Sequence, residues 1–244
     1  MRAPDGCPWD RKQDFDSIKP YLIEETYEVL DAVDSRDWGG LREEIGDLML
    51  EAAFFAQMAD EAGHFRMEDS LDAVNEKLVR RHPHIFGEGT AETAEDVKQR
   101  WDEIKAEEKK DQGREGGLLD GVPRALPSLA EAAQLSSRAA GAGFDWENLE
   151  QVLEKLDEER EELAEARTDG SRKQIEGEIG DILFTIVNVA RFLKVDPEQA
   201  LRRTNRKFRD RFAYVEAKLK EQGKTPRDST LAEMEALWQE AKQQ

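Results

Sequence analysis

The chain of 244 residues is strongly acidic, with 55 Asp and Glu against 36 Lys and Arg and a formal net charge of −19. Such a charge disfavours binding to the nucleic-acid backbone, and the single cysteine, Cys7, excludes an intramolecular disulfide. The most apolar run, 182–190, is too short to cross a bilayer, and residues 1–4 lack a signal-peptide apolar region. We therefore expect a cytoplasmic protein that binds neither nucleic acid nor membrane.

Apolar residues recur at spacings of three and four, and alternating β-branched runs are absent, so the pattern predicts an all-α fold. The helices predicted in the first half are 17–33, 41–62, 70–81 and 95–110, with a loop over 82–92. The residues predicted to be buried on the first two helices are Tyr21, Leu22, Thr26, Val29, Leu30 and Val33, then Ile45, Leu48, Met49, Ala52, Phe55 and Ala56. The stretch 111–127 is rich in Gly and Pro, which predicts a linker.

Beyond the linker the sequence repeats itself. The helices predicted there are 128–140, 147–167, 172–193, 197–221 and 230–242. The run Glu44-Ile45-Gly46-Asp47 recurs as Glu178-Ile179-Gly180-Asp181, 134 positions later (178 − 44). The sequence therefore predicts two tandem helical-bundle repeats, 1–110 and 128–244, joined by the linker.

Acidic residues at a spacing of three lie on paired helices in each repeat. The four carboxylates of the second repeat are Glu159, Glu162, Glu178 and Asp181, and those of the first are Glu25, Glu28, Glu44 and Asp47. A spacing of three puts two carboxylates on one helix face, so two packed helices would aim four at one point. Converging carboxylates repel unless a cation lies among them, and oxygen ligands suit magnesium or manganese.

A single acidic pair says little in a chain with 55 acidic residues, because a solvated helix face explains it as well. The duplication makes chance a poor explanation. Gly46 and Gly180 recur inside the predicted helices, where glycine costs about 1 kcal/mol relative to alanine. Close approach of another helix or of a ligand usually offsets that cost.

Basic and aromatic residues recur downstream of the carboxylates. Lys77, Arg81 and Trp101 of the first repeat correspond to Lys207, Arg211 and Trp238 of the second. Lysine and arginine four apart on a helix offer a point charge and a bidentate fork to phosphates. The alternatives are a solvated basic face and a packed tryptophan.

The motifs together resemble one family. Cys7-Pro8-Trp9-Asp10, Glu24-Glu25-Thr26-Tyr27-Glu28, Glu44-Ile45-Gly46-Asp47 and Arg80-Arg81-His82-Pro83-His84, with their second-half counterparts, are similar to MazG, of the all-α NTP pyrophosphatase superfamily. The resemblance covers essentially the whole chain. It implies hydrolysis of nucleoside triphosphates to monophosphate and pyrophosphate with magnesium, broad base specificity, a housecleaning or nucleotide-pool role, and a homodimer.

The resemblance also implies roles for individual residues. Glu159, Glu162, Glu178 and Asp181 would hold the metal, and Lys207, Arg211 and Trp238 would contact the nucleotide, with catalysis in the second repeat. The first-repeat counterparts are Glu25, Glu28, Glu44 and Asp47, with Lys77, Arg81 and Trp101. Glu159 and Glu178 are thus candidate catalytic residues. Glu158 is our hypothesis for the general base that orients the attacking water.

Two alternatives come from other classes. A di-iron oxidase needs two Glu-x-x-His motifs, and the sequence offers one, Glu61 and His64, because the second half has no histidine. A helical interaction protein that binds metal for stability alone would show metal-dependent melting without turnover.

Overall fold

The computed structural model describes residues 1–91, 93, 96–97, 100–101, 104, 108 and 117–243. The chain divides into two compact units, Met1–Arg114 and Glu115–Gln244, and the division falls within 111–127. Every regular element in the described residues is a helix, as the pattern predicts. The predicted helix 95–110 lies largely outside the described residues, as do linker residues 111–116.

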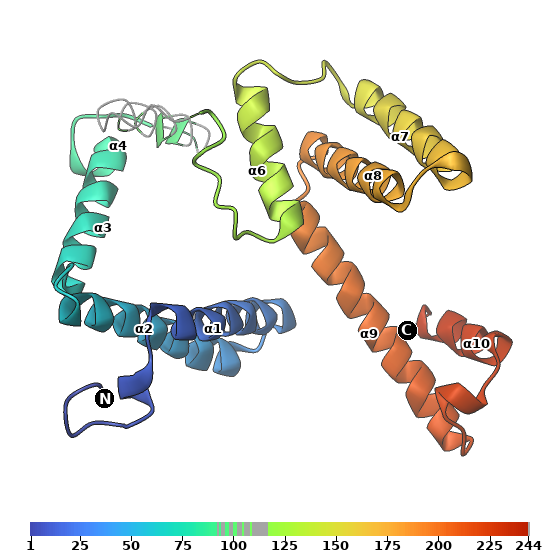
Figure 1. Ribbon diagram of the computed structural model, residues 1–244, viewed down its shortest axis with the longest axis horizontal. Helices are drawn as coiled ribbons and strands as arrows, with labels where there is room; N and C mark the ends of the chain where they lie inside the picture. Colours follow the sequence, from blue (N-terminus) through green and yellow to red (C-terminus); the bar gives the residue numbers. More distant parts are fainter. Residues whose placement is uncertain are drawn as a thin grey trace. The chain divides into compact units, whose positions relative to one another are not determined.

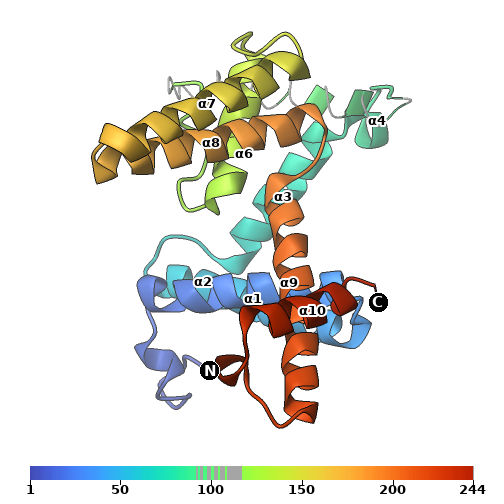
Figure 2. The same cartoon turned by 90° about the vertical axis from the view of Figure 1, so that its right-hand side faces the viewer.

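The first unit is built on an antiparallel helix pair. Its elements are η1 (Asp10–Lys12), α1 (Phe15–Ser35), α2 (Trp38–Glu61), α3 (Met67–Arg81) and α4 (Pro83–Phe86). Asp14 caps α1 by accepting hydrogen bonds from the backbone N–H groups of Asp16 and Ser17, and Asp37 caps α2 in the same way. Figures 1 and 2 show α1 and α2 side by side, with α3 continuing from the end of α2.

The second unit repeats the helix pair. Its elements are α6 (Ser128–Gly141), α7 (Leu149–Asp169), α8 (Arg172–Phe192), α9 (Pro197–Glu221), η2 (Pro226–Asp228) and α10 (Leu231–Ala241). In both views α7 and α8 lie side by side as α1 and α2 do, and α6 packs against α8. Helix α10 folds back on the part of α9 that is remote from α7 and α8.

Each unit has a small buried core. Ile18, Phe54 and Met58 form the first, and Phe55 packs against it. Val215, Leu219 and Leu237 form another between α9 and α10, with Met234 and Trp238 packed against it. Burial of these side chains removes apolar surface from water and fixes each helix against its neighbour.

The structure corrects two predictions. Residues 83–86 form the short helix α4 inside the predicted loop 82–92, with Pro83 at its first position, where proline is favourable. The predicted buried residues Tyr21, Thr26, Val33, Ile45, Met49 and Ala52 are exposed. The apolar residues do lie at helical spacing on α1 and α2, but the neighbouring helix covers only some of them. No helix in the described residues is long and apolar enough to cross a membrane.

Candidate functional site

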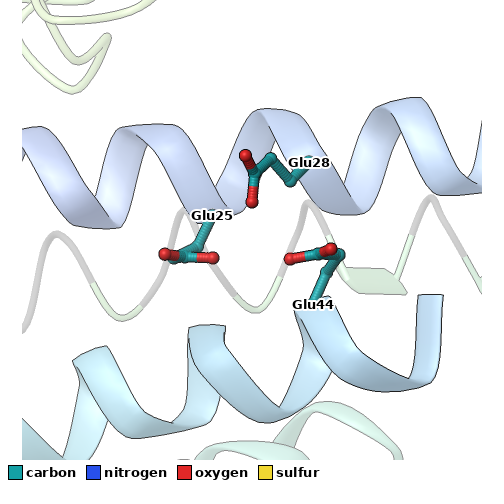
Figure 3. Close-up of side chains that lie close together, drawn as sticks. All are labelled: Glu25, Glu28 and Glu44. Atoms are coloured by element: carbon teal, nitrogen blue, oxygen red, sulfur yellow. The ribbon is translucent and has the colours of Figure 1, made fainter. Parts of the chain in front are cut away.

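Carboxylates of the first unit converge between α1 and α2. Glu25 and Glu28 on α1 and Glu44 on α2 each bring a carboxylate oxygen within 4.8 Å of the others, as Figure 3 shows. Burial, followed by repulsion from Glu28 and Asp47, raises the pKa of Glu25. Burial, with a hydrogen bond to Glu28, raises the pKa of Glu44. Asp47 lies outside the group of three, although its charge acts on both carboxyls.

The second unit has the same arrangement between α7 and α8. Glu159 on α7 and Glu178 and Asp181 on α8 bring one carboxylate oxygen each within 4.8 Å of one another. Glu159 is only 5% exposed, and its Oε2 is buried without a hydrogen-bond partner among the described residues. Glu162 lies outside this group and is exposed. Partial loss of hydration around its carboxyl, together with the nearby charges of Glu159 and Glu178, raises its pKa, although Lys155 acts in the opposite direction.

A lysine that the sequence analysis did not single out enters this cluster. Lys155 Nζ lies 2.9 Å from Glu159 Oε1 and 2.9 Å from Glu158 Oε1, and both contacts raise the pKa of the lysine. The spacing of four from Glu159 is the signal that could have found it. Glu158, the hypothetical base, is outside the cluster, with its side chain 56% exposed.

The two clusters differ in charge at two matched positions. At the repeat offset of 134, Lys155 corresponds to Tyr21 (155 − 21), and the buried Thr185 to Glu51 (185 − 51). Glu51 has a buried oxygen without a hydrogen-bond partner among the described residues, and burial, then Asp47, raises its pKa. The carboxylate of Glu51 therefore lies near the first cluster, close enough for its charge to act on Glu25, and the lysine is lacking there.

A divalent cation fits the second cluster. A buried carboxylate oxygen without a partner costs free energy, and a cation among hard oxygen donors would satisfy it. The site offers such an oxygen on Glu159 and two further carboxylates within reach. Glu159, Glu178 and Asp181 are the residues that would hold the ion.

The predicted phosphate-binding residues lie elsewhere in the second unit. Lys207 and Arg211 stand about 15 Å and 21 Å along α9 from Pro197, at 1.5 Å per residue. The Arg211 guanidinium lies 5.8 Å from the Trp238 ring centroid, and Phe208 lies 5.1 Å from the same ring. Trp238 belongs to α10, on the part of α9 remote from α7 and α8 (Figures 1 and 2). Within one chain, the basic residues do not join the acidic cluster.

In the first unit the basic residues lie on α3, which continues from the end of α2, whereas Glu44 of the acidic cluster lies near the start of α2 (Figure 1). Lys77 and Arg81 lie on α3, and the Arg81 guanidinium is 5.1 Å from the Trp101 ring centroid. Arg81 also forms an ion pair with Glu108, with Nη2 2.6 Å from Oε2.

An apolar pocket of about 570 Å³ opens in the second unit between α6, the residues that precede α7, and α8. Trp146 and Phe184 line it, with Ser136, whose Oγ is buried and has no hydrogen-bond partner among the described residues. Asn188 on its wall is fully buried and accepts a hydrogen bond from Arg191 Nε, 3.2 Å away. Arg191 pairs with Asp145 through two hydrogen bonds. The pocket is thus mostly apolar with a few fixed polar groups, as small-molecule sites are.

The repeated glycines face open space. A Cβ built on Gly46 or on Gly180 meets no atom within 4 Å apart from its own helix backbone and chain neighbours. Of the two alternatives, close approach of another helix and close approach of a ligand, the first is therefore not found among the described residues. The space beside Glu178 and Asp181 remains available to a ligand or to another chain.

Comparison with known proteins defines the class. A family model described as the MazG nucleotide pyrophosphohydrolase domain matches the chain twice, over residues 13–86 and 147–215. The two matches include both acidic clusters and end within α4 and α9, so the duplicated helix pair is the unit that the family shares.

Relatives match over nearly the full chain. The nucleoside triphosphate pyrophosphohydrolase of Escherichia coli K12 is 44% identical, covering 100% of this chain and 94% of that protein. The nucleoside triphosphate pyrophosphohydrolase/pyrophosphatase MazG of Thermotoga maritima is 41% identical, covering 99% and 91%. A crystal structure of a MazG-related protein from Thermotoga maritima is 33% identical over 41% of this chain and 88% of that one, with a TM-score of 0.38. The chain belongs to the MazG nucleotide pyrophosphohydrolase family.

Proposed function

We propose that the chain hydrolyses nucleoside triphosphates to the monophosphate and pyrophosphate at the second-repeat cluster, with magnesium, or manganese in its place. The observation that carries the proposal is the buried Glu159 carboxylate, whose second oxygen has no partner among the described residues, beside Glu178 and Asp181. Family membership and the names of the full-length relatives support the reaction.

The residues divide the work of the reaction between them. Glu159, Glu178 and Asp181, with Glu162 one turn along α7, would hold the metal. The positive charge supplied there offsets the negative charge of the phosphates and of the departing pyrophosphate. Lys155 adds a second positive charge beside Glu159, and its raised pKa keeps it protonated. Glu158 flanks Glu159 and remains our proposed base for the attacking water.

The apolar pocket is proposed to receive the base and sugar. Phe184 on its wall follows Asp181 by three residues and so lies on the same face of α8 as the cluster. A mostly apolar pocket discriminates weakly between related bases. It has few buried polar groups, so binding a different base leaves few hydrogen bonds unmade. Broad base specificity follows, and it suits the clearing of a cytoplasmic nucleotide pool.

A second copy of the chain is proposed to bring Lys207, Arg211 and Trp238 to the cluster. Two observations support a homodimer: the basic residues are remote from the cluster within one chain, and α8 exposes Ile179, Leu183 and Ile186. Burial of such side chains is the main source of binding free energy between subunits. The open space beside Gly180, where an added Cβ would meet no atom within 4 Å, also lies on α8 and could admit a second chain.

Mixing two inactive variants tests this arrangement. Glu159→Gln and Arg211→Ala chains, each inactive alone, are expected to regain part of the wild-type turnover when unfolded and refolded together, because a mixed dimer then carries one intact site. A chain that light scattering shows to be monomeric at micromolar concentration, or mixtures that stay inactive although they form dimers, would contradict the shared site.

The reaction itself is tested by release of pyrophosphate and monophosphate from a panel of natural and modified triphosphates, with magnesium and with a chelator. Turnover lost in Glu178→Ala and kept in Glu44→Ala would support catalysis in the second repeat. The reverse pattern would place it in the first. Magnesium-dependent melting without any turnover would favour a metal-stabilised interaction protein instead.

A further inference from the structure

Two arginines at the end of α3 converge on one carboxylate. Arg80 Nε lies 2.6 Å from Glu108 Oε1, and Arg81 Nη2 lies 2.6 Å from Glu108 Oε2. Arg81 Nε adds contacts of 3.3 Å and 3.2 Å to the two oxygens. The side chains of Arg81 and Glu108 are only 14% and 15% exposed. These hydrogen bonds, first from Arg81 and then from Arg80, lower the pKa of Glu108 to about 2.

The surroundings fix the arginine fork in place. The Arg81 guanidinium lies 5.1 Å from the Trp101 ring centroid, and the His82 ring meets the same indole edge-on at 5.1 Å. Arginine stacked on an aromatic ring keeps its N–H donors in a planar fork that matches carboxylate and phosphate alike. Arg80, whose side chain is 52% exposed, adds a second guanidinium group beside this fork. Two guanidinium groups around one anion are more than a single carboxylate needs, and they suit a phosphate group with several charged oxygens.

The second repeat has the same stack without the carboxylate. Arg211 lies over Trp238 as Arg81 lies over Trp101. Among residues 117–243, no carboxylate lies within ion-pair distance of Arg211. Asp210 takes the place of Arg80 in the sequence repeat (210 − 80 = 130, the offset of Arg211 from Arg81). The two repeats thus differ in whether their arginine is already engaged.

We propose that Arg80 and Arg81 form a phosphate-binding site that Glu108 keeps closed. The Glu108 carboxylate occupies the position of a phosphate group, so a phosphate-bearing ligand binds the first repeat only after displacing it. The Glu108 carboxylate belongs to the same chain as the site and therefore competes at a high effective concentration. The apparent affinity for a phosphate-bearing ligand is reduced in proportion to the fraction of chains in which the site is open. The first repeat is thereby held out of competition with the second for nucleotide and for pyrophosphate.

Calorimetric titration of the full chain with inorganic pyrophosphate tests the proposal. The second-repeat fork is first removed with Arg211→Ala, so that binding reports on the first repeat. In that chain Glu108→Gln is expected to tighten pyrophosphate binding about tenfold or more. Glu76→Gln removes the same charge from an exposed position on α3 and is expected to change nothing. Adding Arg81→Ala to the Glu108→Gln chain is expected to abolish the gain.

Two results would overturn the proposal: Glu108→Gln binding no tighter than Glu76→Gln, or a gain that survives Arg80→Ala together with Arg81→Ala. Circular dichroism establishes that each variant is folded. If Glu108→Gln is not, Glu108→Asp serves in its place, because its side chain is one methylene too short to reach both forks, and failure to tighten there also refutes the idea. Triphosphate turnover with Arg211 intact tests the proposed function separately, since the pyrophosphate titration needs no catalysis.

Discussion

Gly180→Ala separates the stability of α8 from the use of its surface. Glycine in a helix interior costs about 0.5 to 1 kcal/mol relative to alanine. A Cβ on Gly180 meets no atom within 4 Å, so no clash opposes the gain. We therefore expect Gly180→Ala to stabilise the second unit by about 0.5 to 1 kcal/mol and to raise its melting temperature by roughly 2 to 6 °C.

The same methyl group is expected to harm activity. Gly180 lies between Glu178 and Asp181 in the sequence, and in the proposed arrangement the open space beside it would receive substrate or a second chain. Turnover should fall at least about tenfold, which corresponds to about 1.4 kcal/mol of transition-state stabilisation. Gly46→Ala is the matched control, with the same motif and the same open space in the first unit, and should keep wild-type turnover.

Thermal unfolding followed by circular dichroism and a pyrophosphate-release assay measure the two effects in the same samples. A Gly180→Ala chain that is more stable and turns over at the wild-type rate would refute the reasoning, because the open space would then have no function. A destabilised chain would show that another part of the molecule already fills it.

Three further outcomes follow from buried or paired groups. Glu159→Gln should remove the contribution of the second cluster to the rise in melting temperature with magnesium and lower turnover at least about a hundredfold, whereas Glu25→Gln should keep turnover; an active Glu159→Gln enzyme contradicts the site. Leu219→Ala, at a fully buried position between α9 and α10, should lower the free energy of unfolding in urea by about 2 to 5 kcal/mol, and a loss below about 1 kcal/mol would contradict the packing. The pKa of Glu108, lowered from 4.5 to about 2, means that its ion pairs stabilise the fold fully above pH 4.5 and are lost as the pH falls through about 2. The stability difference between wild type and Glu108→Gln should therefore shrink over that range; an unchanged difference would refute the pairing.

The helices could be predicted because their boundaries are encoded locally. Asp14, Asp37, Asn148 and Ser171 accept backbone hydrogen bonds at helix starts close to the predicted ones. Helix α4 does not follow from the sequence pattern, because a proline such as Pro83 indicates the end of the preceding helix, although proline also favours a first helical position. Burial was predicted less well, since Met49 and Ile45 follow the helical spacing yet lie where no described helix covers them.

The sequence predicts which residues belong to the candidate site, but it does not predict which of them lie together in one chain. Glu159, Glu178 and Asp181 meet because their helices pack side by side, which the repeat pattern suggested. Lys207, Arg211 and Trp238 share that sequence pattern and still lie on remote parts of α9 and α10, because the length of α9 carries them away. Spacing along a chain does not encode the direction in which a long helix leaves its neighbours.

The lysine in the second cluster has a consequence for the order in which metal is taken up. If the first cluster were to bind a divalent cation as well, an ion entering the second would have to share Glu159 with Lys155, whereas the first has the further carboxylate of Glu51 nearby and Tyr21 in place of the lysine. The attraction of the first cluster for a cation would then be stronger. Scarce magnesium would in that case fill the first repeat before the second, and the activation curve would begin with a lag in which bound metal yields no product.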